Sequence, residues 1–173
     1  MLKRKAYERL LRWKNAENRK ALCVLGARQI GKTTLIREFA KEHYEHFVEI
    51  NFIEEPRAKE IFMGNQDADS IITNLTAYKM QPMEPGKTLV LFDEIQEYPD
   101  VRTAMKFLVE DGRFDYIESG SLLGVKFKDI TSYPVGFEET YRMYPMDLEE
   151  FLVFKRRFVD GLDDKKRKLY WDN

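Results

Sequence analysis

A glycine-rich loop between an apolar run and an amphipathic segment constrains the fold of this chain more than any other feature. Residues 26–33 read Gly-Ala-Arg-Gln-Ile-Gly-Lys-Thr, which fits the phosphate-binding pattern G-x-x-x-x-G-K-[ST]. Residues 21–25 before it are apolar, as in a buried strand, and residues 34–41 after it carry apolar side chains on one helical face. A strand, this loop and a helix N-terminus together make an anion site, to which the helix dipole contributes.

The pattern assigns a role to each part of the loop. Its backbone N–H groups face the α- and β-phosphates of a nucleotide, Lys32 reaches the β- and γ-phosphates, and the Thr33 hydroxyl ligates Mg²⁺. We expect Lys32 to act in catalysis as well. The predicted nucleotide-binding residues are Gly26, Ala27, Arg28, Gln29, Ile30, Gly31, Lys32, Thr33 and Thr34.

A second apolar run, residues 87–92, ends in two carboxylates, Asp93 and Glu94. If this run is a strand of the same sheet, both carboxylates lie near the end of the loop. Asp93 is then expected to hold Mg²⁺, and Glu94 to polarise a water for attack on the γ-phosphate. The alternative is an acidic strand end that faces solvent and has no role.

A third polar cluster, Ser119-Gly120-Ser121, follows a weaker strand pattern at residues 114–118. We expect this strand to lie between the loop strand and the Asp93 strand, so that the Ser119 hydroxyl orients the attacking water or senses the γ-phosphate. A simple Gly-Ser turn is an equally good interpretation. A cation for the transition state could come from Arg102, Arg113 or Arg142, and the spacing selects none of them.

The remaining pattern alternates between strands and helices, which predicts an α/β fold: a three-layer sandwich with a mainly parallel sheet. A nucleotide would then bind at the carboxyl ends of the strands. Further strands are expected at 47–52 and 141–144, and helices at 1–16, 54–80 (two pieces, broken near Gly64-Asn65), 100–112 and 146–158.

Composition limits the classes of partner. The chain of 173 residues has 29 basic and 30 acidic side chains, so net charge does not indicate nucleic acid or a membrane surface. No apolar run reaches the length of a membrane span, and no signal-peptide core is present, so we expect a cytoplasmic protein.

The expected division is an N-terminal helix (1–16), a P-loop ATPase core (17–158) and a charged tail (159–173) that marks a truncation point.

Together these segments resemble the ATP-binding domain of prokaryotic AAA+ ATPases of the AAA_14 type. The likeness covers about residues 5–155 and rests on the loop at 26–35, the Leu-Phe-Asp-Glu-Ile-Gln segment at 91–96, the Ser-Gly-Ser segment at 119–121, and the Tyr-Pro-Met-Asp-Leu-Glu-Glu-Phe-Leu segment at 144–152. It implies the AAA+ strand order, binding of ATP with Mg²⁺, and ATP hydrolysis. It also implies an unknown C-terminal domain or protein partner, and homo-oligomers such as AAA+ rings.

Three other functions are alternatives to an ATPase. A small-molecule kinase shares the loop, but the Asp93-Glu94 pair favours water as the acceptor. A GTPase needs an Asn-Lys-x-Asp segment, which the sequence lacks. A nucleotide-dependent switch that binds ATP with little turnover stays open, because Phe137 stands where the family commonly has a basic residue.

Overall fold

Five parallel strands form the central layer of this computed structural model, which describes residues 4–121 and 136–160. The strand order is β2-β3-β4-β1-β5, and every neighbouring pair is parallel. The strands are β1 (Ala21–Gly26), β2 (His46–Asn51), β3 (Thr88–Asp93), β4 (Asp115–Ser121) and β5 (Glu138–Arg142). As predicted, the strand that carries Ser119 lies between the loop strand and the Asp93 strand.

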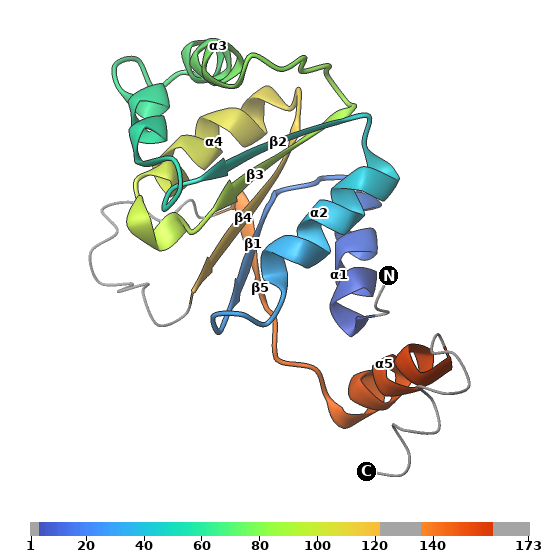
Figure 1. Ribbon diagram of the computed structural model, residues 1–173. Coiled ribbons are helices and arrows are strands. Elements are labelled where there is room, and N and C mark those ends of the chain that lie inside the picture. The colour runs from blue at the N-terminus through green and yellow to red at the C-terminus, as the bar shows by residue number, and fades with distance from the viewer. Residues whose placement is uncertain (1–3, 122–135, 161–173) are drawn as a thin grey trace.

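Helices cover both faces of this sheet (Figure 1). α1 (Lys5–Lys14) and α2 (Lys32–His43) lie on one face; α3 (Ala68–Lys79) and α4 (Val101–Asp111) lie on the other, with the short 3₁₀ helix η1 (Pro56–Phe62). The predicted three-layer α/β sandwich is therefore confirmed. β1 and β3 are buried at every position, as expected for parallel strands covered on both faces.

Side chains alternate between two cores along each strand. Leu22 and Val24 of β1 pack against α1 and α2, whereas Cys23 and Leu25 pack toward α3 and α4. Trp13 anchors α1 in the first core, and its indole N–H donates to the Lys20 carbonyl at 2.7 Å. The helix expected over residues 1–16 is thus part of the same packed body as the sheet.

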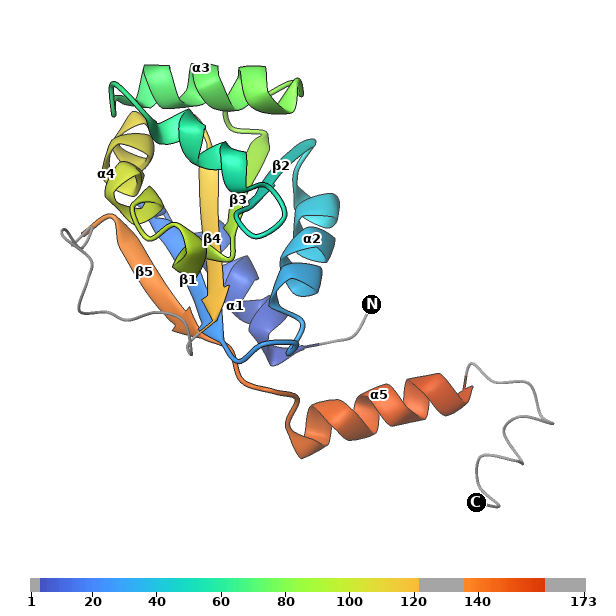
Figure 2. The ribbon, with the colours of Figure 1, turned by 60° about the vertical axis from the view of Figure 1, so that its left-hand side comes forward.

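The carboxyl ends of the strands meet at one edge of the sheet. Figure 2 shows β4 ending there beside the loop that joins β1 to α2. The 3₁₀ helix η2 (Ile95–Glu97) follows β3 at this edge. The predicted nucleotide-binding edge therefore carries all three polar segments singled out in the sequence.

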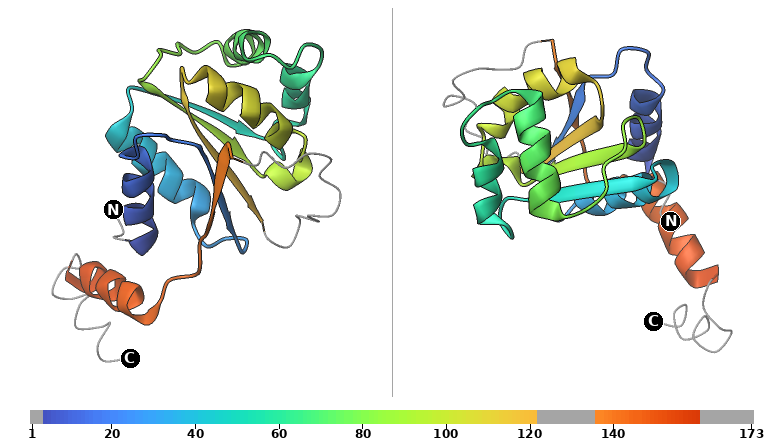
Figure 3. Two further views of the ribbon diagram at one scale, coloured as in Figure 1. Left: turned by 180° about the vertical axis from the view of Figure 1, so that it is seen from behind. Right: turned by 90° about the horizontal axis from the view of Figure 1, so that it is seen from above.

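The last helix, α5 (Leu148–Asp160), extends away from the sandwich (Figure 3). It begins with a reciprocal capping box: Glu150 N–H donates to Asp147 Oδ1 at 2.8 Å, and Asp147 N–H donates to Glu150 Oε2 at 3.1 Å. Several large apolar side chains of α5 are exposed, including those of Leu148 and Leu152.

Two predicted boundaries are wrong. β4 continues through Ser119-Gly120-Ser121, although the predicted strand ended at residue 118, because β1 pairs with these residues as far as Ser121. β5 begins at Glu138 and ends at Arg142, earlier than the predicted 141–144. Among the described residues, no helix is long and apolar enough to cross a bilayer. Most of the predicted tail, residues 161–173, lies outside the described residues.

Candidate functional site: a phosphate-binding loop beside two carboxylates

The loop between β1 and α2 depends on two glycines for different reasons. Gly31 immediately precedes α2 and has φ +86°, a left-handed conformation that glycine adopts without strain. A Cβ on Gly26 would lie 2.5 Å from the Met143 carbonyl oxygen, so glycine lets the end of β1 approach this neighbouring backbone. Lys32, Thr33 and Thr34 form the first turn of α2, where N–H groups lack helical partners and can bind an anion.

The Lys32 side chain folds back into this loop. Its ammonium group donates to the carbonyls of Gly26 at 3.2 Å and Ala27 at 2.8 Å, and the residue is buried. Burial lowers the pKa of Lys32, and the nearby carboxylates of Glu94 and Asp93 oppose this shift. Phosphate oxygens would offer this cation stronger partners than the two neutral carbonyls.

Asp93 at the end of β3 is the centre of the polar contacts. Its Oδ2 accepts from the Thr33 hydroxyl at 2.9 Å, and its Oδ1 accepts from the Glu94 N–H at 3.0 Å and from the Ser119 hydroxyl. Asn51, the last residue of β2, places its amide nitrogen 3.5 Å from Asp93 Oδ2. The fold therefore joins the ends of three strands and the start of α2 at one carboxylate.

These oxygen donors fit a magnesium ion. Mg²⁺ prefers hydroxyl and carboxylate oxygens, retains several waters, and is usually held by one or two protein groups together with phosphate oxygens. Thr33 and Asp93 are 60 positions apart in sequence but in direct contact, next to the loop that would receive the phosphates. Both residues predicted to bind the metal are therefore placed together.

Glu94 follows Asp93 in a left-handed conformation, with φ +56°, which is uncommon for a residue other than glycine. Such conformations often occur where surrounding contacts hold a functional side chain in place. The Gln96 side-chain amide donates to Glu94 Oε2. The carboxylate is only partly buried, so water can reach it.

A known protein family matches most of this chain. The model of the AAA domain family AAA_14 matches residues 18–152, most of the chain. The chain belongs to the AAA_14 family. It is therefore a nucleotide-binding, P-loop ATPase-type domain of the AAA+ superfamily, as the sequence resemblance predicted.

A solved structure supports the AAA+ fold of this AAA_14 domain. Domain III of the Thermotoga maritima replication initiation protein DnaA superposes with a TM-score of 0.58. The match covers 95% of this chain and 75% of the DnaA chain. At 14% sequence identity it shows a shared fold and nothing about function. The search of curated proteins found no match.

Two contacts of the AAA_14 domain were not foreseen. Ser119 was expected to face the attacking water or the γ-phosphate, whereas its buried hydroxyl donates to Asp93. Asn51 was not singled out from the sequence. It is the last residue of β2, as Asp93 is the last residue of β3, and the two residues lie opposite each other in the β2–β3 register. Polar residues at the ends of adjacent parallel strands were the signal that could have identified Asn51.

The three arginines considered as cationic helpers differ in their surroundings. Arg102 is unsuited to act in a neighbouring subunit, because it lies in the core and its Nε donates to Glu138 at 3.0 Å. Arg113 pairs with Asp69 and Asp111. Arg142 is exposed and lies opposite Leu25 in the sheet. Leu25 is the residue immediately before the phosphate-binding loop, so Arg142 lies near that loop. Arg142 is therefore the best placed of the three.

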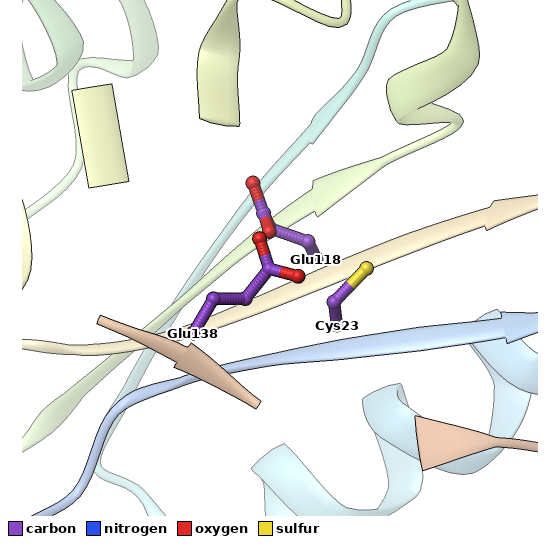
Figure 4. Close-up of side chains that lie close together, drawn as sticks. All are labelled: Cys23, Glu118 and Glu138. Atoms are coloured by element: carbon purple, nitrogen blue, oxygen red, sulfur yellow. The ribbon is translucent and has the colours of Figure 1, made fainter. Parts of the chain in front are cut away.

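A separate polar cluster lies inside the sandwich, away from solvent. The side chains of Cys23, Glu118 and Glu138 lie close together, one each from β1, β4 and β5 (Figure 4). Arg102 neutralises Glu138, whereas neither oxygen of the fully buried Glu118 carboxyl has a hydrogen-bond partner among the described residues. Burial, reinforced by the charge of Glu138, raises the pKa of Glu118, which favours its neutral, protonated form.

Proposed function

We propose that this AAA_14 domain binds ATP together with Mg²⁺ and hydrolyses it, with Glu94 activating the attacking water. The observation that carries the proposal is the contact between Thr33 and Asp93, because it joins the phosphate-binding loop to the strand that delivers Glu94. The match to the AAA_14 family supports ATP as the nucleotide. Water is favoured as the acceptor by the carboxylate that follows Asp93.

Each loop residue has a defined task in this proposal. Residues 26–31 and the first turn of α2 present N–H groups to the phosphates, and Lys32 exchanges its carbonyl partners for phosphate oxygens. Thr33 and Asp93 hold Mg²⁺, and Ser119 fixes the orientation of Asp93 through its hydroxyl. Bound Mg²⁺ would neutralise charge on the phosphates.

Glu94 acts as the general base. Its carboxylate accepts a proton from a water while the water oxygen attacks the γ-phosphorus, and the bond between this phosphorus and the β,γ-bridging oxygen breaks to release ADP. A positioned base of this kind contributes about 10²–10⁴-fold to a rate. The left-handed backbone at Glu94 and its hydrogen bond from Gln96 favour one orientation of this side chain.

One set of contacts favours the alternative, a nucleotide-dependent switch with little turnover. Arg4 donates to the carbonyl of Ile30 in the loop at 3.1 Å, to the carbonyl of Tyr144 at 2.8 Å and to Glu150 of α5 at 3.2 Å. A rearrangement of the loop around phosphate would therefore reach α5 through a single side chain. Binding without turnover would be sufficient for such a signal.

The wider expectations remain proposals. We propose residues 17–158 as the ATPase core, with α1 as an N-terminal helix packed on it, in a cytoplasmic protein. AAA+ domains often oligomerise, and Arg142 is the residue we propose as the cation supplied to a neighbouring subunit.

The proposal is tested by titrating the purified chain with ATP and with GTP, each with and without Mg²⁺, and by measuring phosphate release. We expect saturable binding that prefers ATP, tightens with Mg²⁺ and is followed by turnover. Tight, Mg²⁺-dependent binding without turnover would favour the switch. No binding of either nucleotide would contradict both functions.

A further inference from the structure

Gln96 is the described residue whose side chain contacts the carboxylate of Glu94. It lies in η2, two residues after Glu94, and both the nitrogen and the oxygen of its side-chain amide make hydrogen bonds. The amide nitrogen donates to Glu94 Oε2, and the amide oxygen accepts from the backbone N–H of Ser121 at 3.0 Å. Gln96 therefore connects the proposed base to the last residue of β4.

The end of β4 is shaped to admit this side chain. A Cβ on Gly120 would lie 3.1 Å from Gln96 Oε1 and 3.0 Å from the Ile95 side chain, closer than most real contacts of that kind. Gly120 has no left-handed backbone that would itself require glycine. The close approach of η2 to β4 is therefore the physical reason for glycine at this position.

A base on a short, partly exposed loop needs such a contact. A free glutamate side chain samples several rotamers, and holding it in one of them costs conformational entropy. Misplacing a reacting group by 1 Å can slow a reaction by about 10²-fold. A hydrogen bond that is itself anchored to backbone fixes the carboxylate more firmly than a contact with solvent.

We infer that Gln96 is a positioning residue: it sets the orientation of Glu94 and couples that orientation to the end of β4. This inference rests on the proposed ATPase function. The same strand end holds Asp93 through the Ser119 hydroxyl. A displacement of β4 therefore moves the metal ligand and the base together, one through Ser119 and the other through Gln96.

The chemistry of the two contacts is specific for glutamine. The side chain must accept a hydrogen bond from Ser121 and donate one to a carboxylate. Glutamate at this position could accept but not donate, and would repel Glu94. Methionine has a similar length and no amide, and asparagine is one methylene shorter.

The test measures ATP affinity and the maximal rate of ATP hydrolysis for wild type, Gln96→Met and Gln96→Glu. We expect both variants to bind Mg²⁺ and ATP within about 3-fold of wild type and to hydrolyse ATP about 10- to 100-fold more slowly. Gly120→Ala, which crowds the same contact from the other side, should slow hydrolysis in the same direction. Glu97→Gln, an exposed neighbour in η2, is the control and should match wild type.

A double-mutant cycle distinguishes positioning from general structural damage. If Gln96 acts through Glu94, Gln96→Met should have no further effect on the rate once Glu94→Gln is present. An equal loss in both backgrounds would overturn the inference, and so would hydrolysis by Gln96→Met at or above the wild-type rate. A wild-type chain that binds ATP without turnover would instead overturn the ATPase proposal, and this inference with it.

Discussion

At the scale of single residues, the position of one cation governs the proposed nucleotide site. Lys32 is buried and donates to two carbonyls of its own loop, and no carboxylate in the described part of the chain is hydrogen-bonded to it. Its charge is therefore available to phosphate at little structural cost.

Lys32→Ala should weaken ATP binding by at least about 100-fold, because two charge-assisted contacts to phosphate together amount to about 3 kcal/mol or more. Calorimetric titration with ATP and Mg²⁺ measures this change. Lys41→Ala, an exposed lysine in the last turn of the same helix, should bind like wild type. Undiminished affinity in Lys32→Ala would refute the assignment of the loop.

The main site residues lie together in the fold, and their signals in the sequence are local, while their roles stay predictions. The loop pattern identifies Lys32 and Thr33, and a buried strand that ends in acid identifies Asp93 and Glu94. The Ser119–Asp93 contact and the burial of Arg102 were missed, because both depend on partners more than 20 positions away. An arginine and a serine have no local pattern that reveals such partners.

At the scale of secondary-structure elements, the start of α5 is the clearest link between distant segments. Glu150 caps α5 and also accepts from the N–H of Lys5 at 2.7 Å and from the side chain of Arg4. The local capping box was predictable from residues 147–150, whereas the contacts with Arg4 and Lys5 join positions about 145 apart. The same limit applies to β5: Glu138, its first residue, is neutralised by Arg102, which lies 36 positions away in the sequence.

Glu150→Ala should loosen α5 while leaving the sheet intact, because it removes one half of the capping box and the anchor for Arg4. The loss of a cap costs about 1 kcal/mol. Hydrogen exchange should become faster in residues 148–156 and stay unchanged in β1 and β4. Glu149→Ala, exposed in the same turn, is the control. Unchanged exchange in α5 of Glu150→Ala would show that Glu150 does not anchor the helix.

At the scale of the whole molecule, two apolar cores on either side of one sheet stabilise the fold, and one buried carboxyl group makes this stability depend on pH. Continuous apolar strands made the sandwich predictable from sequence. The Glu118 side chain was not foreseen, because a glutamate in a strand ordinarily indicates an exposed position. In the structure it shares the core with Cys23, Glu138 and Arg102.

The raised pKa of Glu118 gives this pH dependence a definite sign. The folded state retains the proton at a pH where the unfolded chain, with an ordinary pKa of 4.5, has lost it. The contribution of Glu118 to the free energy of unfolding is therefore complete below the unfolded-state pKa of 4.5. It falls as the pH rises above that value, with a slope of up to about 1.4 kcal/mol per pH unit.

Glu118→Gln should remove this part of the slope, because glutamine is neutral and similar in shape. Urea denaturation between pH 5 and 8 measures the change, and the variant should gain stability over wild type toward the upper end of that range. Glu139→Gln, which removes a β5 carboxylate outside the cluster together with its ion pair to Arg9, is the control for losing a charge from the same strand. A slope equal to that of wild type in Glu118→Gln would mean that Glu118 is ionised in the fold.

The most direct test of the whole account is phosphate release from ATP and Mg²⁺ by wild type and by Glu94→Gln, with ATP affinity measured for both. The account predicts similar affinities and a rate about 10²–10⁴-fold lower in the variant, since the base is lost and the phosphate-binding loop is unchanged. Turnover by Glu94→Gln at the wild-type rate would contradict the role of Glu94 in an ATPase.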